Sequence, residues 1–348
     1  MSSFESRGSS GSACLAMKVR PIAVCSIALF VSTVWPLRAQ GQQQPQGFAV
    51  ERFYPSAPGG GWFIMDDLKI DGGFGAAVAL TTGYSRKPLE IASPDATRHL
   101  SLVSDEAFVD VGVAATYHRY RVYLDFPMPL LITGTSGMIG PYQLSAPTVD
   151  VGTNPDTISD ARVGFDMRLL GQPESSFRVG VGAQLIVPSG TRPDYVTDGT
   201  SRGMVRFLAA GDVGRFSYAG QLGLHIRPVD DSPAPGSPNG NELLFGLSAG
   251  RRFSVGTRWA VLLGPEVYGE TALRSFFGGA TGVEGLVTGR LEGTGDGRRV
   301  RLKLGVGGGL DPHFGAPEWR IVFGVELFGQ RADRGNSPAS GGRRASEE

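Results

Sequence analysis

The sequence predicts an all-β protein, a transmembrane antiparallel up-and-down β-barrel of about twelve strands. The first observation is an alternation near the C-terminus, where Val300, Leu302 and Leu304 alternate with Arg301 and Lys303. A period of two places successive side chains on opposite faces of a strand. The second observation is that similar segments recur along most of the chain. The third is that short and long connections alternate between these segments.

Composition excludes several other classes of protein. The chain has 348 residues and a formal net charge of +0, so it has no basic excess to attract nucleic acid. It contains 52 glycines without a Gly-X-Y period, which excludes collagen. Beyond the first forty residues no long uncharged apolar run occurs, which excludes an α-helical membrane protein. A membrane barrel escapes that test because alternate residues face its lumen.

The N-terminal region is predicted to be a secretory signal peptide over residues 1–39. Lys18 and Arg20 precede an apolar stretch at 22–35, and Ala39 ends an imperfect cleavage site. Met17 is an alternative start, because the residues before it resemble an unstructured extension. Cys14 and Cys25 both lie in this region, so the mature chain is expected to need no disulfide or cysteine-based zinc site.

Three further regions follow the signal peptide. Residues 40–72 are expected to form a periplasmic linker or plug, 73–331 the barrel, and 332–348 a disordered polar tail. The alternation defines twelve strands, at residues 74–84, 109–117, 120–126, 163–169, 177–185, 205–209, 216–226, 243–247, 259–267, 283–291, 300–306 and 319–327. An even number is expected for a single-chain barrel.

The connections predict how the barrel lies in an outer membrane of Gram-negative type. Those after even-numbered strands are short, as at 118–119 and 255–256, and those after odd-numbered strands are longer. In such barrels short turns face the periplasm and long loops face outward. Both termini are then expected in the periplasm. Aromatic residues near strand ends fit interfacial girdles, namely Tyr84, Tyr117, Tyr120, Phe177, Phe216, Tyr218, Trp259 and Trp319.

Three parts of the chain carry a resemblance to a known family. They are residues 48–62, with Pro55, Pro58 and Gly59-Gly60-Gly61, the barrel pattern itself, and residues 315–319. Together they resemble the barrel half of OmpA-like outer-membrane proteins of myxobacterial, δ-proteobacterial type. The resemblance covers about residues 48–331 and implies an outer-membrane barrel. After Arg331 only a short tail remains, so the peptidoglycan-binding domain of that family is not expected here.

The wetter face of the strands carries charges of both signs that are predicted to line the lumen. These are Arg162, Asp166, Arg168, Arg178, Arg206, Glu266, Glu284, Arg290, Arg301, Lys303, Arg320 and Glu326. One interpretation is that they pair across the lumen and hold the barrel closed. The other is a cation-lined pore for small anions.

Residues 48–72 form the candidate plug. They include Trp62 and Phe63, whose apolar surface would be costly to leave exposed to water, and Asp66 and Asp67, which can meet inward arginines. Small inward residues on the middle strands leave room for such a segment. An extra strand, or a lid across the periplasmic rim, is the alternative.

No catalytic, metal-binding or cofactor-binding site is predicted. The four histidines His99, His118, His225 and His313 lack the short spacings of metal ligands. The expected function is a structural barrel or a narrow porin-like channel for small solutes. An outer-membrane hydrolase of the phospholipase or protease type, or a surface-binding scaffold built on the long loops, is the alternative. The expected partners are outer-membrane lipid, the barrel-assembly machinery and small solutes, but not nucleic acid.

Overall fold

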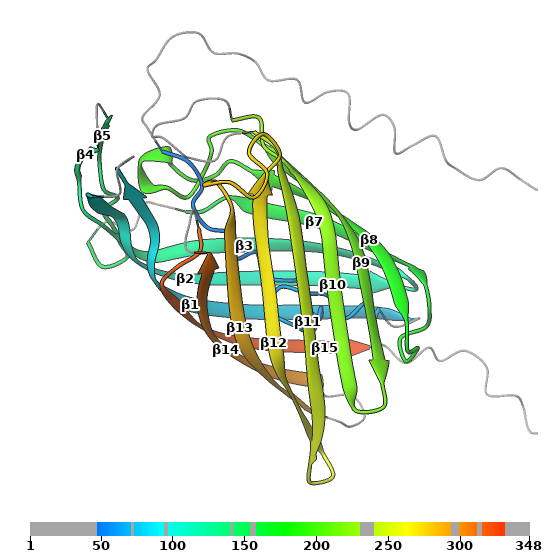
Figure 1. The fold of residues 1–348 in the computed structure, drawn as a ribbon. Helices are drawn as coiled ribbons and strands as arrows, with labels where there is room; N and C mark the ends of the chain where they lie inside the picture. Colours follow the sequence, from blue (N-terminus) through cyan, green and yellow to red (C-terminus); the bar gives the residue numbers. More distant parts are fainter. Residues whose placement is uncertain are drawn as a thin grey trace, which may run out of the picture. The chain divides into compact units, whose positions relative to one another are not determined.

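The computed structural model describes residues 47–70, 73–93, 97–139, 142–153, 158–229, 240–293, 299–311 and 315–330 (Figure 1). The predicted signal peptide and polar tail lie outside the described residues. Within the described residues, no helix is both long and apolar enough to cross a membrane.

A closed antiparallel barrel accounts for most of the chain. Its strands, in spatial order, are β1 (Phe74–Ala92), β2 (His99–Tyr117), β3 (Tyr120–Thr133), β7 (Ala161–Leu170), β8 (Arg178–Val187), β9 (Arg202–Val213), β10 (Phe216–Ile226), β11 (Glu242–Val255), β12 (Trp259–Ala272), β13 (Gly282–Gly293), β14 (Arg299–Asp311) and β15 (Trp319–Gln330). Pairing of β1 with β15 closes the ring. The described sheet has thirteen strands including β6 (Val149–Asp150), which pairs only with the end of β3, so twelve form the barrel.

The alternation seen in the sequence determines which side chains face outward. Phe165 on β7, Leu247 on β11 and Val287 on β13 have exposed fractions of 41%, 72% and 60%. Their sequence neighbours Asp166, Ser248 and Thr288 are buried inside the barrel. Eleven of the twelve predicted segments lie entirely within strands, and the remaining one begins at Phe177, one residue before β8. Their side chains alternate between the two faces as predicted, apart from Val179, which was expected outside and is buried. The predicted antiparallel barrel is therefore confirmed.

Two strands are longer than the sequence pattern suggested. β1 and β2 each have 19 residues and stay paired through a region that we expected to be mostly loop. Apolar side chains from their extensions pack against the β4–β5 hairpin (Gly137–Ile139 and Tyr142–Leu144) and β6. This small apolar core beyond the alternating region explains why the pairing continues there.

The two ends of the barrel differ in their connections. The short-turn rim carries the tight connections after β2, β9 and β11. The long-loop rim carries the connections after β1, β3, β8, β10, β12 and β14, including η1 (Arg192–Asp194) and the β4–β5 hairpin, which extends past the barrel in Figure 1.

Residues 47–70, which we call the lumen segment, pass through the inside of the barrel. The segment begins at the long-loop rim, where Arg192 Nε donates a 2.7 Å hydrogen bond to the Gly47 carbonyl. It ends near the short-turn rim, where Arg168 Nη1 donates to the Ile70 carbonyl at 2.5 Å. Its only bridge of β type joins Gly61 and Asp66, so within the described residues it adds no strand to the sheet.

This path bears on the expectation that both termini share the periplasmic side. The termini themselves lie outside the described residues. The first and last described residues, Gly47 and Gln330, nevertheless lie at opposite rims, because the lumen segment traverses the barrel before β1 begins. A segment joined to β1 at the short-turn rim was expected to start there, and sequence position alone gave no indication of the crossing.

Candidate functional site: the occupied barrel lumen

Apolar side chains of the lumen segment pack against glycines of the barrel wall. A Cβ atom added at Gly250 would lie 2.7 Å from the Trp62 ring, and one added at Gly305 would lie 3.0 Å from the Phe63 ring. Met65 and Leu68 approach Gly246 and Gly180 in the same way. Because glycine has no side chain, the wall leaves the space that these four residues fill.

A wall carboxylate binds the backbone of the segment at mid-barrel. Glu266 on β12 accepts hydrogen bonds of 3.0 Å from the backbone N–H groups of both Phe63 and Ile64. Thr288 on β13 donates a 2.7 Å hydrogen bond to the same carboxylate. These donors satisfy a fully buried charge, which would otherwise be costly to remove from water.

Ion pairs hold both aspartates of the segment. Arg121 on β3 contacts the Asp66 carboxylate, and Arg290 Nη1 lies 3.4 Å from Asp67 Oδ2. The Arg290 guanidinium also lies over the Trp62 ring, 5.7 Å from its centroid. Charge-assisted contacts of this kind fix the position of the turn that follows Phe63.

Two further ion pairs fix the segment nearer the long-loop rim. Arg320 Nη1 and Nη2 each donate a 2.9 Å hydrogen bond to Glu51. Arg52 Nη2 and Nε lie 3.2 Å from carboxylate oxygens of Glu242 and Glu270, respectively. The segment is therefore held along its length by contacts with opposite walls.

Several wall charges that contact the segment also have a partner within the wall. Arg320 pairs with Glu284 at 2.8 Å, and Arg290 Nε lies 2.9 Å from Glu292. The same holds for Arg121 with Asp166, Lys303 with Glu326, and Arg162 with Asp110. Each of these five basic side chains thus keeps an ion-pair partner in the wall that does not depend on the segment.

All of the charged residues expected in the lumen face inward and are buried, namely Arg162, Asp166, Arg168, Arg178, Arg206, Glu266, Glu284, Arg290, Arg301, Lys303, Arg320 and Glu326. The plug candidates Trp62, Phe63, Asp66 and Asp67 are buried among them. Acids and bases pair closely across this interior, as Arg206 does with Asp166 at 3.2 Å.

Some lumen space remains beside the segment. A cavity of about 430 Å³ at the short-turn rim is lined in part by Pro58, Gly59 and Lys69. Smaller cavities of about 60 and 20 Å³ adjoin Tyr54 nearer the long-loop rim. Between these regions the segment is tightly packed, since Trp62, Phe63 and Met65 are each 0% exposed.

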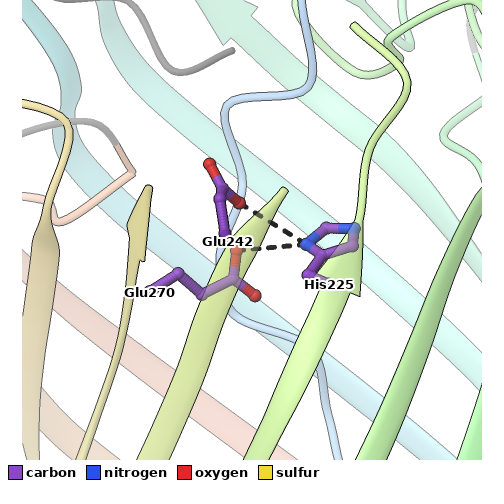
Figure 2. A group of neighbouring side chains, drawn as sticks. All are labelled: His225, Glu242 and Glu270. Atoms are coloured by element: carbon purple, nitrogen blue, oxygen red, sulfur yellow. Dashed lines mark hydrogen bonds and ion pairs between the residues drawn. The ribbon is translucent and has the colours of Figure 1, made fainter. Parts of the chain in front are cut away.

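Sequence reasoning missed a group that comes together from three adjacent strands. His225 on β10, Glu242 on β11 and Glu270 on β12 point toward one another in Figure 2. Spacing along the chain gave no indication of it, because its members are brought together by strand pairing rather than by a helix or a tight turn. The detectable signal was three inward polar residues at the long-loop ends of consecutive strands.

A hydrolase of the Ser–His type would need a serine close to His225, and the serine on the same strand is Ser217. Its hydroxyl contacts Asp212 near the short-turn rim, whereas His225 contacts Glu270 near the long-loop rim. The two side chains that a Ser–His hydrolase would combine are therefore separated along β10.

A carboxylate in the β8–β9 loop anchors the start of the segment. Asp198 Oδ1 accepts a 2.8 Å hydrogen bond from the Ala49 backbone N–H and one of 2.7 Å from Arg227 Nη2. Burial alone would raise the pKa of Asp198, but Arg227 and Arg202 hold that pKa below its usual range. The carboxylate therefore stays ionised and continues to accept the hydrogen bond from the Ala49 N–H at neutral pH.

Comparisons with known proteins found likenesses in structure only. No family model matches the sequence, and no curated protein does. An outer membrane channel from Pseudomonas putida F1 is similar with a TM-score of 0.45 and 9% identity, covering 74% of this chain and 96% of that chain. The NanC porin is similar with a TM-score of 0.42 and 5% identity, covering 73% of this chain and 99% of the porin chain. The monoaromatic hydrocarbon channel CymD is similar with a TM-score of 0.39 and 10% identity, covering 76% of this chain and 90% of the CymD chain.

At these TM-scores, none of the likenesses bears on what this chain does. Nor is any of them specific to the OmpA-like barrels that residues 48–62 and 315–319 resemble.

Proposed function

We propose that this protein is an outer-membrane channel for small solutes that is closed by its own lumen segment. The observation that carries the proposal is the double pairing of the wall charges. Arg320, Arg290 and Lys303 each contact the segment and also pair with a wall carboxylate. Displacement of the segment would leave these charges paired, so the barrel can remain folded around an open lumen.

The way in which the segment is attached also supports displacement. Its backbone joins the rest of the described chain by one backbone–backbone hydrogen bond, from Val50 N–H to the Tyr195 carbonyl at 3.0 Å. Its other backbone–backbone hydrogen bonds are internal, as between Ser56 and Phe63. Side-chain contacts can be exchanged for water one at a time, whereas a strand would have to leave the sheet as a unit.

The outer surface supports the outer-membrane location. Apolar side chains cover the strand exteriors, and exposed aromatic residues such as Tyr117, Phe216 and Trp259 lie near the short-turn rim. An apolar band between aromatic girdles is the surface expected of a barrel in a bilayer. With the short turns in the periplasm, the lumen segment would begin at the extracellular rim and cross the barrel to the periplasmic rim, where β1 begins.

Deleting residues 47–68 while keeping the signal peptide tests the proposal. The variant and the full chain are refolded into planar bilayers, and folding is verified by heat-modifiable electrophoretic mobility. We expect the full chain to show almost no ion conductance and the deletion variant to show steady conductance, because the segment no longer occupies the lumen. A folded deletion variant without conductance would refute the channel.

A further inference from the structure

The group of His225, Glu242 and Glu270 has the composition of a transition-metal site. Imidazole nitrogen and carboxylate oxygen are common zinc ligands, and His₂Glu sets occur in catalytic zinc sites. Strand pairing places His225 directly opposite Glu242, while Glu270 lies on the next strand. All three side chains are almost completely buried, so their orientation is determined by the barrel.

The distances match the separation between ligands around one metal ion. His225 Nδ1 lies 3.1 Å from Glu270 Oε2 and 3.5 Å from Glu242 Oε2. Zinc bonds of about 2.0–2.2 Å place the ligand atoms of a tetrahedral site roughly 3.3 Å apart. One ion can therefore contact all three side chains with only small rotations.

An unpartnered oxygen points into the group. Glu242 is 1% exposed, and its Oε2 atom has no hydrogen-bond donor, although Oε1 of the same carboxylate accepts from Arg227 at 2.7 Å. Buried carboxylate oxygens normally have a donor or a cation. The direction of this atom, toward His225 Nδ1, indicates where a cation belongs (Figure 2).

The surrounding charges favour an additional cation. The ion-pair network around the group includes the carboxylates of Asp160, Asp198, Glu242 and Glu270 and the guanidiniums of Arg52, Arg202 and Arg227. Within this set one negative charge is in excess while His225 is neutral. A divalent ion bound to a neutral imidazole would offset that excess.

Arg52 is the only member of this network that belongs to the lumen segment. Its guanidinium contacts Glu270 Oε2, the atom that also lies nearest to His225 Nδ1. We propose that His225, Glu242 and Glu270 bind a divalent transition metal of the Zn²⁺ class, in competition with Arg52 of the lumen segment. The binding site stands independently of the proposed channel function, whereas any effect of the metal on gating rests on it.

Cobalt absorption of the full chain, refolded in detergent, tests the site. Co²⁺ reports N/O coordination by its visible bands, and Zn²⁺ should abolish them by displacement. We expect one site in the wild type and at least about tenfold tighter binding in Arg52→Gln, because a like charge is removed beside the ion. His225→Ala and Glu270→Gln should both lose the bands, while His99→Ala, which removes an exposed histidine beside Glu90, should retain them.

Each outcome decides between the alternatives. Folding is checked for every variant by electrophoretic mobility, and Glu270→Gln, which keeps the side-chain shape, serves if His225→Ala does not fold. Bands that persist in folded Glu270→Gln would place the metal elsewhere and overturn the site. No bands in folded Arg52→Gln would also overturn it, and equal affinities of wild type and Arg52→Gln would overturn the competition.

Discussion

Glu51 and Arg320 form a two-point ion pair between the lumen segment and β15, with both hydrogen bonds at 2.9 Å. Arg320 has Glu284 in the wall as a second partner. Removing the charge of Glu51 therefore weakens the attachment of the segment but leaves the Arg320–Glu284 ion pair of the wall intact. Hydrogen bonds to charged groups contribute about 1.5–3 kcal/mol each, and the partial exposure of Glu51 reduces this value.

For Glu51→Gln we therefore expect the segment to bind the barrel wall less tightly, with a loss of about 1–3 kcal/mol in binding free energy, and the channel to open more often. Single-channel recording in planar bilayers measures the open probability. The matched control is Glu318→Gln, which alters an exposed carboxylate at the same rim. Equal open probabilities in both variants would show that Glu51 does not hold the segment.

Gly305→Leu tests the fit between the wall and the segment. A new Cβ would lie 2.8 Å from Val322 Cγ2 in the wall and 3.0 Å from the Phe63 ring, so we expect overpacking of about 1–3 kcal/mol and a partly expelled segment. Adding Phe63→Ala should remove the contact with the segment and restore part of its protection from proteolysis. Gly279→Leu, where a Cβ meets no atom within 4 Å, is the control. If Phe63→Ala gives no relief, the contact with Val322 rather than the one with the segment dominates the effect of Gly305→Leu.

Lipid exposure can be tested on a single strand. Leu247 faces outward from the middle of β11, whereas Val255 is exposed at its short-turn end. We expect Leu247→Arg to destabilise the folded barrel by about 2–4 kcal/mol and Val255→Arg by about 0–1 kcal/mol. Equilibrium urea unfolding in lipid vesicles gives both values. Similar losses at the two positions would contradict a bilayer around the middle of the barrel.

Orientation can be tested with introduced cysteines. Gly279 lies in the β12–β13 loop and Thr257 in the β11–β12 turn, and both are exposed. A membrane-impermeant maleimide should label Gly279→Cys on intact cells but label Thr257→Cys only after the outer membrane is opened. The opposite pattern would invert the barrel and place Gly47 on the periplasmic side.

The anchor at Asp198 predicts a pH dependence. Its pKa is lowered in the folded protein, so its contribution is present above the unfolded value of ~3.9 and is lost as pH falls through the lowered pKa. Asp198→Asn should therefore speed hydrogen exchange at Ala49 relative to wild type at neutral pH. This difference should shrink only well below pH ~4. A difference that disappears already near pH ~6 would assign the anchor to another group.

The strands and the faces of their side chains could be predicted from the amino-acid sequence alone. Alternation at Val300, Leu302 and Leu304 is a local property, because backbone geometry sends successive side chains to opposite sides of any strand. The inward positions of Arg301 and Lys303 followed from the same rule. The order of short and long connections likewise followed, since each hairpin joins neighbours in the chain.

Which side chains meet inside the barrel became clear only from the folded structure. Glu51 and Arg320 are 269 positions apart, and Arg52 and Glu242 are 190 apart, so no local pattern pairs them. The lumen segment lacks a strand period, so its path depends on the shape and charge of a wall that exists only once the barrel has closed. The same holds for His225, Glu242 and Glu270, whose alignment depends on the register of three paired strands rather than on their spacing along the chain.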